Sequence, residues 1–382
     1  MKKQAVVFCL AVLGAACQAQ QEVQITVSNS TEVHRRQETI QLDWMDVQKH
    51  LPNVEAEEAA VLDVQTHQPL VTQVLKIDGR TTLLFQTTLE PGQKKQFILQ
   101  KRPAGMEPPA SPITTYCRFI PERKDDFGWE NDKVAFRVYG PALEDETITS
   151  GIDAWGKCVP YPVIDKFIRD YNEKQIPYHY DHGEGGDFYK VGNTLGCGGL
   201  APFVDGKVCL PSHNFAAWKI LGNGPIRSVF ELTYRPWQAG SYTVSEVKRI
   251  SIDLGSQMSR IECTYTCSQT DTLPLAAGIV LRETSRQTWT APQSIAYWLP
   301  TDFIKGFMGC GVVFGAEWDV KPLEADGHLL LTLQHKIDKP VVYYAGSCWD
   351  KNEEFNTFEK WQQYLKIFKQ RLDHPVAVEW QP

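Results

Sequence analysis

Hydrophobic and polar residues alternate one by one along much of the chain, which is the pattern of half-buried β-strands. In the first hundred residues this pattern predicts strands at 23–27, 71–77, 81–85 and 96–99. Asp78-Gly79 separates the second run from the third, and such a dipeptide between alternating runs is typical of a tight hairpin. We therefore predict a small N-terminal β-sandwich module over residues 20–100.

A proline-rich linker and a larger β domain follow this module. Residues 101–115 contain four prolines, which lack the amide hydrogen that a sheet ladder requires. Residues 116–382 return to alternation, with strands predicted at 134–139, 228–234, 242–254, 258–267 and 329–333. The two longest runs flank Gly255-Ser256, which favours a long antiparallel hairpin. We predict that residues 116–382 form a large antiparallel β-sandwich, the catalytic domain.

Helical spacing is rare along the chain. Apolar residues three and four apart predict helices at 163–173 and, more clearly, at 356–372. A closing strand is predicted at 375–380, so the second helix is expected to pack on the outside of the sheet. The predicted fold class is therefore mainly β with a few peripheral helices.

The first residues indicate export from the cytoplasm. Lys2 and Lys3 precede an apolar run from Ala5 to Ala16 that is too short to span a membrane. Residues 1–19 are predicted to be a signal peptide, and Cys17 offers a second interpretation as the lipid-anchored first residue of a lipoprotein. Either route predicts a periplasmic protein or an outer-membrane lipoprotein.

Composition and charge argue against one class of partner. The 382 residues carry 39 Lys and Arg against 46 Asp and Glu, which gives a net charge of −7, and the chain has no long basic run. A nucleic-acid partner is not expected, because binding to phosphates requires a basic face. The 42% of hydrophobic residues are enough to form a sizeable core.

Eight of the ten cysteines lie beyond the signal segment. In an oxidising compartment they could form disulfides, and small buried free thiols fit them equally well. Cys197 and Cys209 could pair across a turn. Cys263 and Cys267 are not expected to pair, because four residues of strand separate them by about 13 Å.

The segment from Tyr178 to Tyr189 combines histidines, tyrosines and carboxylates with glycines that let a ligand approach the backbone. Imidazole titrates in the range that general acid–base chemistry needs, and a tyrosine can return a proton. The candidate catalytic residues are His179, His182, Tyr180 and Tyr189, and the candidate binding residues are Asp181, Glu184 and Asp187. Two alternatives stay open: a divalent metal held by His179, Asp181 and His182, and a surface loop whose side chains cap one another.

A second polar cluster precedes and enters the strand predicted at 134–139. It joins guanidinium groups, a carboxylate and an amide with aromatic rings, which suits the binding of a hydroxylated or carboxylated sugar ring. Its candidate substrate-binding residues are Arg123, Glu130, Asn131, Arg137 and Tyr139. The neighbouring Lys124, Asp125 and Asp126 are instead predicted to form a salt-bridged turn.

These two clusters also carry a resemblance to a known family. The order Trp129-Glu130-Asn131-Asp132, then Arg137-Val138-Tyr139-Gly140, then the histidine-glycine segment resembles a Bacteroidetes family of secreted proteins of unknown function from polysaccharide-utilisation gene clusters. The Trp-Glu-Asn-Asp segment is also similar to carbohydrate-processing super-sandwich folds of the galactose-mutarotase type. The resemblance implies a β-super-sandwich acting on an oligosaccharide or polysaccharide, with some relatives linked to removal of water from uronate-ended oligosaccharides.

The mechanism that fits these expectations is β-elimination by a carbon–oxygen lyase, either an oligosaccharide dehydratase or a polysaccharide lyase. Arg123 or Arg137 would neutralise the uronate carboxylate, a histidine of the 178–189 segment would remove the C5 proton, and one of its tyrosines would return a proton. A glycoside hydrolase would instead need facing carboxylates, such as Glu130 with Glu184 or Asp187. A sugar epimerase and a non-catalytic glycan-binding lipoprotein are further alternatives.

Overall fold

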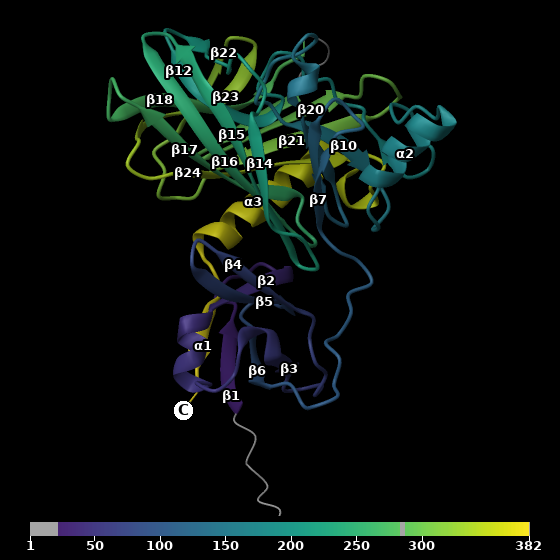
Figure 1. Ribbon diagram of the computed structural model, residues 1–382, viewed down its shortest axis with the longest axis vertical. Helices are drawn as coiled ribbons and strands as arrows, with labels where there is room; N and C mark the ends of the chain where they lie inside the picture. The colour runs from purple at the N-terminus through teal and green to yellow at the C-terminus, as the bar shows by residue number, and fades with distance from the viewer. Residues whose placement is uncertain (1–21, 283–286, 382) are drawn as a thin grey trace, which may run out of the picture.

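The structure is a computed structural model that describes residues 22–282 and 287–381. The chain is mainly β, and its antiparallel sheets form a small module and a large one (Figure 1). The predicted signal peptide and Cys17 lie outside the described residues and stay predictions. In the part of the chain that the structure describes, no helix combines the length and apolar character needed to cross a membrane.

Two facing sheets build the small module, which is the β-sandwich expected near the N-terminus. One sheet has the order β25-β1-β6-β3 and the other β2-β5-β4. Phe85 and Phe97 meet between them with ring centroids 5.0 Å apart. The hairpin predicted at Asp78-Gly79 is confirmed, because Ile77 pairs with Arg80. The strands are β1 (Glu22–Ser28), β2 (Arg35–Asp43), β3 (Ala59–Asp63), β4 (Thr72–Ile77), β5 (Arg80–Leu89), β6 (Lys94–Lys101) and β25 (Ala377–Trp380).

The last strand of the chain returns to the first one. Val27 of β1 pairs with Val378 of β25, so residues from both ends of the sequence share a sheet. The sequence assigns this strand to the large domain, whereas the structure places it in the small module. Helix α3 (Phe358–Asp373) crosses between the modules and delivers the strand there (Figure 1). A helix that the alternation does not reveal, α1 (Trp44–His50), covers the small module.

Three sheets build the large module. The longest, within the described residues, has the order β14-β15-β16-β17-β24-β21-β20-β19, and the others have the orders β13-β12-β18-β23-β22 and β11-β10-β9-β8-β7. The predicted hairpin around Gly255 is confirmed, since β16 and β17 pair from Val244–Cys267 to Ile252–Ser259. The strands of the long sheet are β14 (Ala217–Gly222), β15 (Arg227–Ala239), β16 (Tyr242–Asp253), β17 (Met258–Cys267), β19 (Gln287–Ala291), β20 (Ser294–Pro300), β21 (Phe307–Val313) and β24 (Val341–Trp349).

The remaining strands are shorter and include those that carry the candidate site. They are β7 (Tyr116–Ile120), β8 (Asp126–Glu130), β9 (Ala135–Val138), β10 (Asp153–Lys157), β11 (Gly185–Gly186), β12 (Cys197–Val204), β13 (Lys207–Val208), β18 (Thr272–Val280), β22 (Lys321–Ala325) and β23 (His328–Lys336). Helix α2 (Ile164–Lys174) packs beside the β7–β11 sheet, close to its predicted limits. The eight cysteines within the described ranges are free thiols, so Cys197 and Cys209 do not pair.

Helix α3 packs on the outside of the long sheet, as its position before the closing strand predicts. Glycine makes the close approach possible: a side chain at Gly309 would come within 2.8 Å of Trp361, and one at Gly311 within 2.9 Å of Leu365. The indole of Trp361 donates a hydrogen bond to the carbonyl oxygen of Cys310 at 3.0 Å. The helix begins after Thr357, whose hydroxyl accepts from the amide of Lys360.

Candidate functional site

A buried polar cluster lies on the face of the β7–β11 sheet against which α2 packs. Arg137 of β9 pairs with Asp153 of β10, and this register places their side chains on one face. Asp126, at the start of β8, projects to the same face, and the loop that follows α2 brings Asp187 over it. We call Asp126, Arg137, Asp153 and Asp187 the arginine cluster.

One guanidinium organises the arginine cluster. Nη2 of Arg137 lies 2.7 Å from Oδ2 of Asp153 and 2.8 Å from Oδ2 of Asp187, while Nε lies 3.6 Å from Oδ2 of Asp126. All four side chains are buried. The guanidinium also lies 5.2 Å from the ring centres of both Tyr139 and Trp155, which is cation–π distance. Three carboxyl groups therefore share one buried positive charge.

Burial sets the protonation of these groups. It raises the pKa of Asp126 to about 6, although Arg137 and Arg123 act in the opposite direction. Burial and the nearby Asp187 raise the pKa of Asp153 well above its ordinary range. Burial opposes the charge of Arg137, but the three carboxylates hold its pKa well above the usual value. Burial therefore favours the protonated form of Asp126 and Asp153, while the neighbouring carboxylates favour the charged form of Arg137.

His179 lies at the edge of the arginine cluster that reaches solvent, and 36% of its side chain is exposed. We call this edge the mouth of the cluster. Its Nδ1 is 3.1 Å from the carbonyl oxygen of Asp187 and 3.5 Å from the carboxylate of the same residue. The imidazole packs against the rings of Tyr178 and Phe303, at centroid distances of 4.7 and 4.9 Å. Arg123 donates to the hydroxyl of Tyr178 at 2.7 Å, so a second guanidinium adjoins this mouth.

Several buried atoms of this region have no hydrogen-bond partner among the described residues. They are Nε and Nη1 of Arg137, Oδ1 of Asp153 and Oδ2 of Asp126. A buried polar group without a partner costs about 1–3 kcal/mol. Such a concentration of unused hydrogen-bonding capacity favours a functional site over a purely structural ion pair.

Five of the residues proposed from the sequence come together here. Arg137 and Asp187 belong to the arginine cluster, Tyr139 stacks on the guanidinium, and Arg123 and His179 lie at the mouth. Burial raises the pKa of Tyr139 far above the usual tyrosine value, so its hydroxyl stays protonated. These five residues all belong to the candidate site.

Other residues of the 178–189 segment stabilise the loop itself. Asp181 accepts hydrogen bonds from the amides of Gly183 and Gly185, at 2.8 and 3.1 Å. The ring of His182 contacts the carbonyl oxygen of Pro177 at 3.0 Å. Tyr180 is 53% exposed. This part of the segment behaves as the loop of mutually capping side chains that the sequence allowed.

Glu184 and Tyr189 lie away from the mouth of the cluster. Glu184 binds Lys166 of α2 at 2.7 Å and accepts from the hydroxyl of Tyr161 at 2.6 Å. Tyr189 is fully buried, which raises the pKa of its hydroxyl well above the ordinary value. A tyrosine held in its neutral form inside the core is poorly placed to exchange protons with a substrate.

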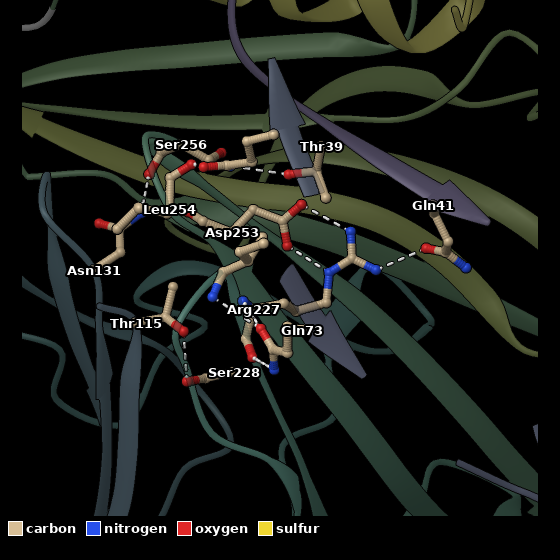
Figure 2. Close-up of polar contacts among 12 residues, drawn as sticks. Thr39, Gln41, Gln73, Thr115, Asn131, Arg227, Ser228, Asp253, Leu254 and Ser256 are labelled. Carbon is tan, nitrogen blue, oxygen red and sulfur yellow. Dashed lines mark hydrogen bonds and ion pairs between the residues drawn. The ribbon is translucent and has the colours of Figure 1, made fainter. Parts of the chain in front are cut away.

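Glu130 and Asn131 make structural contacts, so the geometry does not favour their predicted role in substrate binding. The carboxylate of Glu130 is buried, contacts Nζ of Lys157 at 2.7 Å and accepts from the amides of Val163 and Ile164 at the start of α2. A carboxylate at a helix N-terminus is favoured by the exposed amide groups there. The amide of Asn131 donates to the carbonyl oxygens of Asp253 and Ser256, and thereby ties β8 to the β16–β17 turn (Figure 2).

The proposed metal ligands do not converge. Within residues 22–282 and 287–381, no group of three or more His, Cys, Asp or Glu side chains is arranged to hold a metal ion. His179 faces Asp187, Asp181 faces backbone amides of its own turn, and His182 faces Pro177. The geometry therefore does not favour a metal bound by these three residues.

Sequence reasoning missed three contributors to the site. Asp126 was expected in a salt-bridged turn but lies buried at the start of β8, and Asp153 was not singled out. The available signal was a polar residue inside an apolar strand, since Asp153 lies between Ile152 and Ala154. Phe303 could not be found by spacing, because more than a hundred residues separate it from His179.

The raised pKa of Asp126 predicts a pH dependence that Asp126→Asn should remove. The folded state binds this proton more tightly than the unfolded chain does, so stability is lost as pH rises from about 4 to about 6. The wild type should lose about 2–3 kcal/mol relative to Asp126→Asn between pH 4 and pH 7. Urea unfolding across this range measures the difference, and parallel profiles for the two proteins would contradict the prediction.

Comparison with known proteins identifies the family of this chain. A profile described as a domain of unknown function (DUF4861) matches residues 27–378. "Uncharacterized protein P7" of Formosa agariphila is 37% identical over 376 residues, with 94% of this chain and 93% of that protein covered. The sequence-based expectation of a family of unknown function is confirmed, whereas its occurrence in secreted polysaccharide-utilisation systems stays a prediction.

Two solved structures share the fold. One is described as a protein in the glycosyl hydrolase family 38 from Enterococcus faecalis, with a TM-score of 0.51 and 9% identity. The other is described as an alpha-mannosidase from Enterococcus faecalis, with a TM-score of 0.50 and 9% identity. The matches cover 96% and 95% of this chain but only 48% and 46% of those chains, so this chain spans about half of their length.

These comparisons overturn one prediction about chemistry. The structures that share the fold are described as a glycosyl hydrolase family 38 protein and an alpha-mannosidase, and neither description is that of a lyase. The prediction of a carbon–oxygen lyase is therefore wrong. The predicted fold class is confirmed, because the chain is mainly β and is built from packed antiparallel sheets.

Proposed function

The chain belongs to the DUF4861 family, and we propose that it is a carbohydrate-active enzyme that hydrolyses a glycosidic bond at the mouth of the arginine cluster. The observation that carries this proposal is the partly exposed imidazole of His179 held against the buried Asp187. Carbohydrate as the substrate class is supported by the fold shared with structures described as a glycosyl hydrolase family 38 protein and an alpha-mannosidase.

His179 is assigned the proton transfer to the oxygen of the leaving sugar. A histidine is suited to this step because its unperturbed pKa lies near the working pH of most enzymes. The carboxylate of Asp187, 3.5 Å from Nδ1, stabilises the charged imidazolium and orients the ring. Arg137 holds Asp187 in place, so Arg137 is a positioning residue that need not touch substrate.

Phe303, which packs on His179, and the adjoining Asp302 are the next two residues of the proposed site. Phe303 is 45% exposed and packs on the imidazole, so its free face offers a sugar ring a stacking surface. Hydrolysis also needs a group that activates water. Asp302 is an exposed carboxylate beside Phe303, and the amide of Lys190 fixes it through a 2.9 Å hydrogen bond to Oδ2. We assign this second role to Asp302.

The test is release of reducing ends from a panel of neutral and acidic oligosaccharides. The wild type should release them, Asp302→Asn should not, and Phe303→Ala should raise KM by up to about tenfold with kcat nearly unchanged. Phe307→Ala is the matched control, because this exposed phenylalanine stacks on Trp298 and should leave KM unaffected. Binding without any release of reducing ends would reject hydrolysis and favour a glycan-binding protein.

A further inference from the structure

A groove separates the small module from the outer face of the long sheet. It has a volume of about 730 Å³, within the usual range of ligand sites, and lies between strands β4 and β5 on one side and β15, β16, β17 and β24 on the other. A smaller cavity of about 160 Å³ is lined by some of the same residues, Arg227, Ser251, Arg260 and Tyr344. The two cavities therefore adjoin along the module junction.

Positive charge dominates the lining of this groove. Four arginines line it, Arg80, Arg227, Arg249 and Arg260, against two carboxylates, Asp78 and Glu262. Arg227 and Arg249 are also paired with Asp253 and Glu231, which lie outside this lining, so the accessible positive charge of the groove comes mainly from Arg80 and Arg260. Accessible cationic groups inside a concave surface raise the local concentration of anions.

Two of the arginines have little else to bind. Arg80 is exposed and forms no ion pair with the residues that the structure describes. Arg260 pairs with Glu262 through Nη1 at 2.6 Å and adjoins the hydroxyl of Tyr344, and 39% of its side chain is exposed. By contrast, Arg249 is held by Glu231 and Asp78.

The walls of the groove are fixed by contacts between the modules (Figure 2). Arg227 binds Asp253 through two hydrogen bonds and donates to the side chain of Gln41 at 2.8 Å. Gln73 accepts from the amides of Ile226 and Arg227 and donates to the carbonyl oxygen of Arg227. A groove held open by such contacts binds a ligand at low reorganisation cost.

We propose that this groove is a second binding site, separate from the arginine cluster, that takes an oligosaccharide bearing carboxylate or sulfate groups. Arg80 and Arg260 bind the anionic groups, because a guanidinium fork matches the oxygens of both. The ring of Tyr344 and the hydroxyls of Thr82 and Ser251 face the sugar. That the ligand is a saccharide is inferred from the proposed function, whereas the presence of anionic groups on it is inferred from the arginines alone.

The test is calorimetric binding of the full chain to three probes at low salt: oligogalacturonate, sulfated dextran oligosaccharides and neutral dextran oligosaccharides. Arg80→Gln/Arg260→Gln should weaken binding of the acidic probes by about tenfold or more. The matched control is Lys219→Gln/Arg235→Gln, which removes the same charge from exposed positions of β14 and β15 outside the groove and should bind as the wild type does. Arg80→Glu, a single change in an exposed hairpin, gives the same answer if the double variant folds poorly.

The outcomes separate cleanly. Tighter binding of one acidic probe than of the other identifies carboxylate or sulfate as the preferred group. Equal affinity of wild type and Arg80→Gln/Arg260→Gln, equal weakening in the control variant, or a preference for the neutral probe would each overturn the proposal. Because the readout is binding and not turnover, a failure of hydrolysis at His179 leaves this test intact.

Discussion

Replacing His179 with alanine is expected to lower kcat/KM for glycoside hydrolysis by about 10²–10⁴-fold, while the fold stays intact. The imidazole is the partly exposed titratable ring at the mouth of the arginine cluster, and Asp187 adjoins it at 3.5 Å. Its removal leaves the leaving oxygen without a proton donor. The pairs of Arg137 with Asp153 and Asp187 do not depend on the imidazole, so little stability should be lost.

His182→Ala is the matched control for this experiment. It removes a second histidine of the same loop, whose ring contacts the carbonyl oxygen of Pro177 and not the arginine cluster. Kinetics with the best oligosaccharide of the panel and thermal unfolding of both variants give the comparison. The assignment of His179 fails if His179→Ala keeps more than a tenth of the wild-type kcat/KM, or if His182→Ala loses as much.

The alternation of the sequence was sufficient for most of the fold, because a strand with one buried face must repeat every two residues. The β16–β17 hairpin and the β4–β5 hairpin follow directly from that repeat and from their turn residues. The sheet that β25 joins does not follow from the sequence pattern, since any exposed sheet edge could accept this strand. Its pairing with β1 depends on the path of α3, which only the packing of Trp361 and Leu365 on the long sheet determines.

Residues of the candidate site could be predicted where polar residues lie close together in the sequence. They could not be predicted where the pairing of strands brings distant residues together. Arg137, His179 and Asp187 were proposed because they lie in polar segments. Asp153 meets Arg137 only through the register of β9 and β10, which sequence spacing cannot give. The contacts of Glu130 could not be predicted for a related reason. Its partners are backbone amides of α2, and every residue type except proline has such an amide, so the sequence does not identify them.

The second large effect concerns stability. Arg137→Met is expected to destabilise the protein by about 3–5 kcal/mol, because removing one partner of a buried ion pair leaves the other charge uncompensated. Methionine roughly preserves the volume of the side chain, so the loss reports on charge more than on packing. Arg123→Met is the control, since Arg123 is partly exposed and lies 3.7 Å from Asp126, and it should cost clearly less. Urea unfolding of the two variants at pH 7 measures the difference.

The pH dependence of Arg137→Met separates lost charge from lost contacts. Protonated carboxyl groups need no counter-charge, so the deficit relative to the wild type should shrink as the pH is lowered from 7 towards 5. Asp187→Asn in the Arg137→Met background should likewise recover part of the loss, with a coupling free energy of about 1–3 kcal/mol. A deficit that stays constant with pH and is not reduced by Asp187→Asn would mean that Arg137 acts through its packing on Tyr139 and Trp155.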